Sequence, residues 1–321
     1  MDILYLIGNG FDKAQGLATS YPEFYDYLMQ LKLEDPLEMA VLKDLESDYE
    51  TWADLENALG NYTAHFSNST EFLHILNFFN TRLKEYLRAE NEKMKTLTLS
   101  SEKLVRDLCL PSLYLEPQGR SLFHSYWDDG KIHNISIVSF NYTSTFEQVI
   151  NKFPQEQIYH NQRFRINNLL HIHGTINDMI LVGVNDSGQI ANEVFRNDVI
   201  LSYEFIKPKI NEGCQNSRNR LFEDLVQTAD IIVLFGISLG KTDNKWWQAI
   251  GERMNSLSPP FLLYFPYDPV KNTEAHPNYK FLWSDQYIAF IKERMSIKRS
   301  VEDLRKQICV GINKSILVLT E

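Results

Sequence analysis

Cysteine is scarce in this chain, with three in 321 residues. Cys109, Cys214 and Cys309 lie far apart, so no two of them form a Cys-x-x-Cys pair. This spacing excludes a structural zinc ribbon and a disulfide framework, and it suits a reducing cytosol. We therefore expect a cytoplasmic protein that holds no metal.

Long apolar runs and basic clusters are also missing. The longest apolar run, Ile231–Leu239, is far too short to cross a bilayer. No basic stretch precedes the apolar run near the N-terminus, so a signal peptide is not expected. The formal net charge is −10, whereas a duplex phosphate backbone attracts clustered Lys and Arg. Neither a membrane nor nucleic acid is therefore an expected partner.

The chain is rich in apolar and aromatic side chains, at 44% and 12% of residues, which is enough to form a substantial core. Short apolar runs alternate with helical patterns, and this alternation is typical of a parallel, doubly wound sheet. We predict a Rossmann-like α/β fold with buried strands at Ile3–Ile7, Ile135–Phe140, Asn168–Ile172, Met179–Val182, Ile231–Phe235 and Phe261–Phe265.

The stretch 22–110 carries a helical pattern instead. Apolar side chains recur every three or four residues from Phe72 to Leu87, and Ser69 or Thr70 is placed to cap that helix. Further helices are expected after Asp243, as N-cap, and over Val301–Lys314. We predict that residues 1–20 and 130–321 form one α/β nucleotide-binding domain. Residues 21–129 would form a large helical insertion after the first strand.

Two glycine-flanked loops follow predicted strands. Gly8, Asn9 and Gly10 end the first strand, and the stretch 236–240 (GISLG) ends the strand at 231–235. Ligands of open α/β sheets bind outside the carboxyl ends of the strands, where glycines let backbone N–H groups approach a phosphate. Lys13 stands where the third glycine of a GxGxxG pattern would be. The alternative for each loop is an ordinary turn.

Polar side chains follow two other predicted strands. The amide of Asn141 can fix a ribose hydroxyl or a water, although it can also simply cap a helix starting at Thr143. His171 and His173 lie two residues apart on a predicted strand and would share one face. We interpret His173 as a general base near pH 7 and His171 as structural. The alternative for both is a core histidine bonded to backbone.

Carboxylates in two helical regions are further candidates. On one helix, Trp52 and Glu56 would share a face at a spacing of four, whereas Asp54 and Glu56 would not. Glu56 could then reach the pocket as a second acid–base group, and Asp243 at its helix start is a further possible site residue. The alternative is a core tryptophan beside a carboxylate in the first turn of a helix.

The order of these stretches resembles that of the sirtuin superfamily, in which a GxG loop, a strand-end Asn, His-Gly and Gly-x-Ser-Leu follow one another. Within it, the stretches NGFD, GLATSY, WADLE, FNYT and HIHG resemble the phage abortive-infection family AbiH, and this likeness covers nearly the whole chain. The resemblance implies Asn141 and His173 as catalytic residues. It implies cofactor-binding roles for Gly8, Asn9, Gly10, Asp12, Gly236 and Ser238.

The chain also departs from the sirtuin pattern. Sirtuin deacetylases carry a zinc module on two Cys-x-x-Cys pairs, which this sequence lacks, so deacetylation is not expected. Asp12 replaces the usual small residue of the first loop, where its charge would repel a diphosphate unless it bonds a sugar hydroxyl instead.

The resemblance implies an antiphage effector that hydrolyses NAD to nicotinamide and ADP-ribose. A non-catalytic sensor of NAD or ADP-ribose, and a hydrolase acting on another nucleotide, remain as alternatives. The partners expected on this view are a dinucleotide, a second copy of the chain and a phage-derived trigger.

Overall fold

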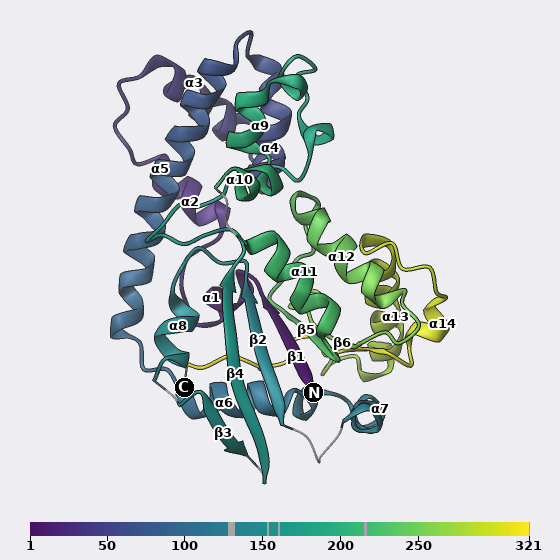
Figure 1. Ribbon diagram of the computed structural model, residues 1–321. Helices are drawn as coiled ribbons and strands as arrows, with labels where there is room; N and C mark the ends of the chain where they lie inside the picture. Colours follow the sequence, from purple (N-terminus) through teal and green to yellow (C-terminus); the bar gives the residue numbers. More distant parts are fainter. Residues whose placement is uncertain (128–131, 153, 160, 215–216, 321) are drawn as a thin grey trace.

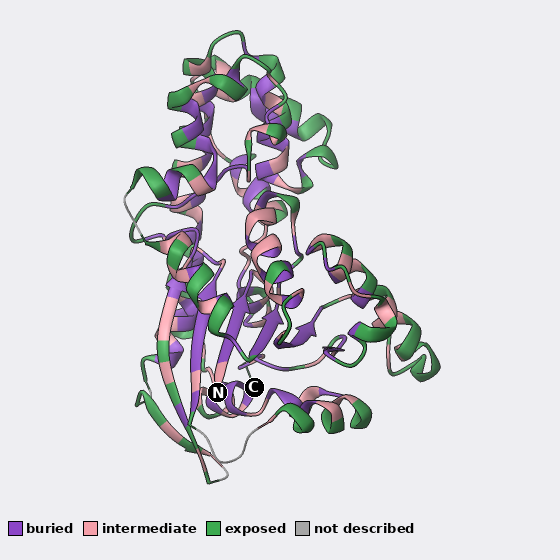
Figure 2. Ribbon diagram, turned by 45° about the vertical axis from the view of Figure 1, so that its right-hand side comes forward, coloured by how far each residue is buried: buried purple, intermediate pink, exposed green. Residues whose placement is uncertain are grey.

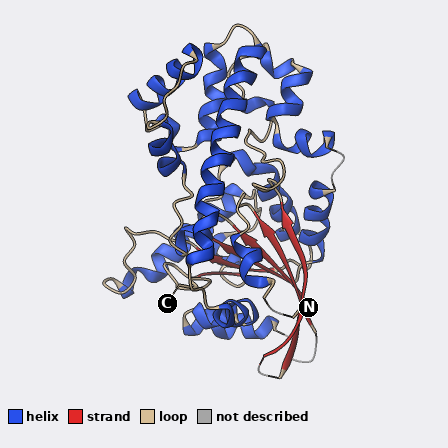
Figure 3. Cartoon of the chain, turned by 90° about the vertical axis from the view of Figure 1, so that its left-hand side faces the viewer, coloured by secondary structure: helices blue, strands red, loops and turns tan. Residues whose placement is uncertain are grey.

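The computed structural model describes residues 1–127, 132–152, 154–159, 161–214 and 217–320. Within this part of the chain, seven strands form a single sheet, and helices lie against both of its faces (Figures 1 and 3). The predicted α/β fold class is confirmed.

The strands span β1 Asp2–Ile7, β2 His133–Ser139, β3 Glu156–Tyr159, β4 Gln162–His171, β5 Ile231–Phe235, β6 Phe261–Phe265 and β7 Ile308–Val310. Their order in the sheet is β3-β4-β2-β1-β5-β6-β7, and only the pair of β3 and β4 is antiparallel. Without β3, the six parallel strands follow the order 3-2-1-4-5-6 of Rossmann folds. The strand order therefore reverses between β1 and β5, which is where such folds bind ligands.

Both faces of the sheet are buried, as Figure 2 shows for its central strands. Along β1, Ile3, Tyr5 and Ile7 pack on one face, and Leu4 and Leu6 pack on the other. Helices α1, α6, α7 and α8 cover the first face, and α11, α12 and α13 cover the second. Burial on both faces explains why these strands appear in the sequence as continuous apolar runs.

The helices span α1 Gly10–Ala14, α2 Tyr21–Leu28, α3 Pro36–Ser47, α4 Leu55–Tyr62, α5 Ser69–Lys93, α6 Ser101–Cys109, α7 Pro117–Tyr126, α8 Thr145–Ile150, α9 Val199–Phe205, α10 Lys207–Gly213, α11 Arg218–Thr228, α12 Asn244–Met254, α13 Lys280–Arg294 and α14 Val301–Leu304.

A second core lies beyond the carboxyl ends of the strands, in a region we call the helical cap (residues 21–93 and 176–206). Helices α2 to α5 supply its first part, and α9 with the chain that precedes it supplies the second (Figure 1). Helices α6 and α7, by contrast, pack against the sheet. The predicted boundary at residues 129 and 130 lies outside the described residues, and the division into two domains stays a prediction.

The predicted strand Met179–Val182 was wrong. In this stretch Ile180 forms only an isolated bridge with Gly174, and the Leu181 amide donates a hydrogen bond to the His173 carbonyl. Ile180 and Val182 are buried because they pack into the core of the helical cap. The residues of this run are apolar because helices bury them, and not because they pair within the sheet.

The predicted closing helix Val301–Lys314 was also wrong, because helix α14 ends at Leu304. The chain continues into β7, which pairs in parallel with β6 and forms the edge of the sheet. At the start of α5, the cap is Asn68 and not Ser69 or Thr70, since the Asn68 side chain accepts the Glu71 amide.

Candidate functional site

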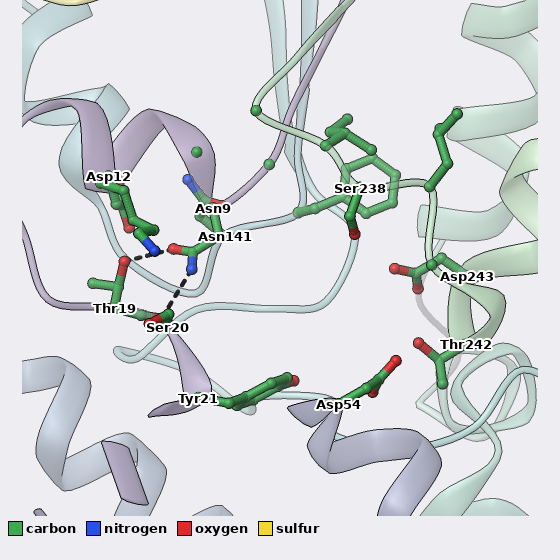
Figure 4. A pocket seen from close by; sticks show the side chains of 18 of the residues that line it. Asn9, Asp12, Thr19, Ser20, Tyr21, Asp54, Asn141, Ser238, Thr242 and Asp243 are labelled. Atoms are coloured by element: carbon green, nitrogen blue, oxygen red, sulfur yellow. Dashed lines mark hydrogen bonds between the residues drawn. The ribbon is translucent and has the colours of Figure 1, made fainter. Parts of the chain in front are cut away.

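A pocket of about 670 Å³ opens at the carboxyl ends of β1, β2, β5 and β6. Figure 4 shows Asn9, Asp12 and Asn141 on one side of it and Asp54, Thr242 and Asp243 on the other. Every site residue predicted from the sequence lines this pocket, namely Gly8, Asn9, Gly10, Asp12, Glu56, Asn141, His173, Gly236, Ser238 and Asp243. The fold thus brings together stretches that are far apart in the chain.

The glycines of the two loops make room for each other. A Cβ atom on Gly10 would lie 2.4 Å from the Gly236 Cα, and Gly236 has a φ of +64°. The Gly10 amide donates to the Gly236 carbonyl at 3.0 Å, and the Gly8 amide donates to the Phe235 carbonyl at 2.9 Å. Because these two amides are already bonded to protein, they are not the phosphate donors that the sequence pattern suggests.

The loop between β5 and α12 offers backbone donors instead. Its carbonyls at Ile237 and Gly240 accept hydrogen bonds from Tyr264 Oη at 3.0 Å and Trp247 Nε1 at 2.8 Å. The amides of residues 238–240 donate no hydrogen bond to any residue in the described ranges. Successive backbone N–H groups without protein acceptors can bind an anion where they converge.

Asn141 presents a buried oxygen to the pocket. The residue is 6% exposed, and its Oδ1 has no hydrogen-bond partner within the described part of the chain. Its backbone is fixed, because the amide donates to Ser139 Oγ at 3.2 Å and the carbonyl is 2.8 Å from His171 Nδ1. The capping alternative was wrong, since α8 begins at Thr145 after Ser144.

Asp12 lies on α1 and is buried beside Asn141. One carboxylate oxygen, Oδ2, accepts the Thr143 hydroxyl at 2.5 Å, and the other has no partner among the residues described. Burial raises the pKa of Asp12 from 3.8 to about 6, although the hydrogen bond from Thr143 opposes this shift.

The raised pKa of Asp12 predicts a pH-dependent loss of stability. Its stabilising contribution is complete below the unfolded pKa of 3.8 and disappears as the pH rises through about 6. An Asp12→Asn variant cannot titrate. The free energy of unfolding of the variant, relative to that of the wild type, should therefore increase by roughly 1–2 kcal/mol from pH 5 to pH 8. Urea unfolding of both proteins across this range checks the result. A difference that does not change with pH would contradict it.

A buried ion network lies on the opposite side of the pocket. Lys207, at the start of α10, is 1% exposed. Its Nζ lies 2.7 Å from Glu56 Oε2 and 2.6 Å from Asp243 Oδ1. Nε2 of His173 lies 3.0 Å from the same Asp243 oxygen, and Nδ1 has no hydrogen-bond partner in the described ranges.

The charges in this network follow from burial and from the shared lysine. Burial raises the pKa of Glu56 more than Lys207 lowers it. For Asp243, burial opposes ionisation, but Lys207 and His173 outweigh it and lower the pKa. The two carboxylates thus shift in opposite directions, and we assign the ionised state to Asp243 because it contacts both Lys207 and His173. Burial lowers the pKa of His173 despite Asp243, which leaves its imidazole neutral near pH 7.

The two histidines do not share a strand face, which corrects that prediction. Strand β4 ends at His171, and the chain then turns through Gly174, whose φ is +76°. His171 Nε2 lies 2.5 Å from Glu147 Oε1 on α8. Burial opposes protonation of His171, but Glu147 outweighs it and raises the pKa. These bonds hold the His171 ring in place, which agrees with the structural role predicted for it.

Trp52 and Glu56 do not lie on one helix, contrary to the prediction. Trp52 belongs to a short 3₁₀ turn, and α4 begins only at Leu55. Asp54 caps α4 by accepting the Asn57 amide at 3.1 Å, and it lines the pocket together with Glu56. Asp243 precedes α12 but accepts no amide of that helix, because its carboxylate is bonded to Lys207.

Lys207 was missed by the sequence analysis. It lies between two helical segments with no neighbouring motif, and its partners are 151 and 36 residues away in the chain. A lysine at such a position carries no local signal of burial.

The described residues contain no cluster of three or more His, Cys, Asp or Glu side chains placed to hold a metal ion. None of the helices described is both long and apolar enough to span a membrane.

The strand order and the position of the pocket define a Rossmann-like α/β protein with a cavity at its topological switch point. Residues 4–262 match the family model described as Bacteriophage abortive infection AbiH, and the chain belongs to this family. The predicted AbiH membership is confirmed, and the family indicates a role in abortive infection by bacteriophage. No curated protein matches the sequence.

Proposed function

We propose that this AbiH protein is an NAD glycohydrolase with a sirtuin-like site, which removes NAD during phage infection. The observation that carries this proposal is a group of buried polar atoms that line one pocket without protein partners. They are Oδ1 of Asp12, Oδ1 of Asn141 and Nδ1 of His173. Buried polar atoms are nearly always bonded, so these three atoms fit a site made to bind a polar ligand.

The dimensions and donors of the pocket suit a dinucleotide. Its volume of about 670 Å³ lies within the roughly 300–1,000 Å³ typical of small-molecule and cofactor sites. The free amides of residues 238–240 would receive the diphosphate. Asn141 and Asp12 would bond ribose hydroxyls, which resolves the repulsion expected between Asp12 and a diphosphate.

The chemistry requires a leaving group, a stabilised cation and a base. The bond between the nicotinamide nitrogen and C1 of the ribose breaks, and its electron pair leaves with nicotinamide. Ionised Asp243 stabilises the positive charge that develops on the ribose. A water adds to C1 and gives its proton to His173, which is neutral and therefore able to accept it.

Purified protein separates the proposal from its alternatives. Calorimetry measures NAD binding, and chromatography measures the release of nicotinamide and ADP-ribose. We expect both binding and release. Tight binding without release would identify a sensor, and no binding would favour an enzyme acting on another nucleotide.

The cellular prediction concerns NAD during infection. We expect NAD to fall in phage-challenged cells that express the wild-type chain and to remain in cells that express His173→Ala. A metabolite profile at matched times after challenge measures this. Equal NAD in the two strains would contradict the proposal, and the profile would show whether another nucleotide is consumed instead.

A further inference from the structure

Four segments meet at the buried ion network. Glu56 comes from α4 of the helical cap, Lys207 from α10, Asp243 from the loop before α12 and His173 from the chain after β4. Lys207 is the central group, because its Nζ contacts both carboxylates at 2.7 and 2.6 Å. A lysine that is 1% exposed cannot be solvated, so its charge depends entirely on these partners.

The backbone around this network is tied to the same residues. Glu56 Oε1 accepts the Gly183 amide at 3.3 Å, and the Lys207 amide donates to the Val184 carbonyl at 3.0 Å. The Leu181 amide donates to the His173 carbonyl at 2.8 Å. The cap segment 181–184 is therefore attached at one end to His173 and at the other to Glu56 and Lys207.

We propose that Lys207 is a positioning residue that joins the helical cap to His173 by holding Glu56 and Asp243 on a single buried cation. This inference rests on the proposed function, in which His173 is the general base. Lys207 does not line the pocket and does not act on the substrate directly. It acts by fixing the place and the charge of Asp243, which in turn contacts His173.

Several charges act on His173, and their balance determines whether the pKa of its ring rises or falls in a variant. Asp243 favours the protonated ring, whereas Lys207 and Arg218 of α11 disfavour it. Asp54 and Glu56 act on the same network from α4. When Lys207 is removed, the charge of Asp243 is left for His173 to balance. The imidazole should then bind a proton more tightly.

The test follows the titration of the His173 ring by NMR in three variants of the full chain. In Lys207→Met the pKa of His173 should rise, and in Asp243→Asn it should fall below that of the wild type. Lys103→Met is the matched control, because Lys103 also contacts a buried carboxylate, Asp107 at 2.6 Å, but on α6. That variant should leave the titration of His173 unchanged.

Kinetics provide a second readout. In Lys207→Met, kcat for NAD cleavage should fall by about tenfold on the acid limb of its pH profile, as a displacement of that limb by one unit would produce, and much less at pH 7, where His173 of the wild type is already neutral. The acid limb of the kcat profile should move to higher pH, while KM should change little because Lys207 does not touch the ligand. A merely structural lysine would lower the fraction of active protein without moving the profile.

If Lys207→Met does not fold, the double variant Glu56→Gln/Lys207→Met replaces it, since it also removes the buried carboxyl group that would lose its Lys207 partner. Its His173 titration should also move upward. An unchanged titration in both Asp243→Asn and the folded Lys207 variant overturns the inference. If the titration shifts in the variants as expected but the wild-type protein never cleaves NAD, the proposed function is overturned and the positioning role is retained.

Discussion

His173→Ala and Asn141→Ala should each lower the rate of NAD cleavage by about 10²–10⁴-fold, the usual contribution of general acid–base and positioning groups. Few protein contacts depend on the atoms assigned to catalysis, because Asn141 Oδ1 and His173 Nδ1 have no hydrogen-bond partners in the described ranges, and His173 Nε2 contacts the Asp243 carboxylate at 3.0 Å. Their removal should therefore affect turnover much more than folding. Initial rates of nicotinamide release, together with urea unfolding curves, measure the two effects separately.

His124→Ala is the control for these variants. His124 is an exposed histidine on α7, which packs against the sheet and does not line the pocket. This variant should cleave NAD at the wild-type rate. If His173→Ala and Asn141→Ala retain wild-type rates as well, the catalytic roles assigned to these two residues are wrong.

Gly236→Ala should lower the free energy of unfolding by about 2–5 kcal/mol. A left-handed φ costs a residue with a Cβ about 1–2 kcal/mol, and overpacking costs a further 1–3 kcal/mol or so. Both costs apply, because Gly236 has a φ of +64° and its added Cβ would lie 2.7 Å from the Gly10 Cα. Guanidinium unfolding of the wild type and the variant measures the difference.

Two other glycines separate these costs. Gly16 has a φ of +85° but no heavy atom within 4 Å of an added Cβ, so Gly16→Ala should lose only about 1–2 kcal/mol. Gly10→Ala adds a Cβ only 2.4 Å from the Gly236 Cα without a left-handed φ, so it should lose about 1–3 kcal/mol. Equal losses in Gly16→Ala and Gly236→Ala would show that the contact between the two loops contributes little.

The central part of the fold was predictable because strands buried on both faces leave a clear pattern. Ile231–Phe235 and Phe261–Phe265 were predicted with the bounds that the structure has. The edges were harder to predict. Strand β3 alternates between exposed and half-buried residues, and β7 is three residues long, so neither produces a continuous apolar run.

The site was easiest to predict where it follows strands. Gly8, Asn141 and Gly236 each come soon after a strand end, and parallel strands bring their carboxyl ends to one edge of the sheet. Lys207 and the orientation of His173 depend on how the helical cap packs on that edge. Such contacts between distant segments leave no periodic pattern in one sequence.

The two-part composition of the helical cap has a consequence for synthesis. Helices α2 to α5 leave the ribosome well before residues 176–206, which complete their core. Until then, apolar side chains such as Phe72 and Phe79 have no partners from the second part, and Phe72 packs edge-on against Phe205 in the finished protein. Nascent chains with exposed apolar surface aggregate readily. We therefore expect the nascent chain to depend on chaperones until residues 176–206 have left the ribosome.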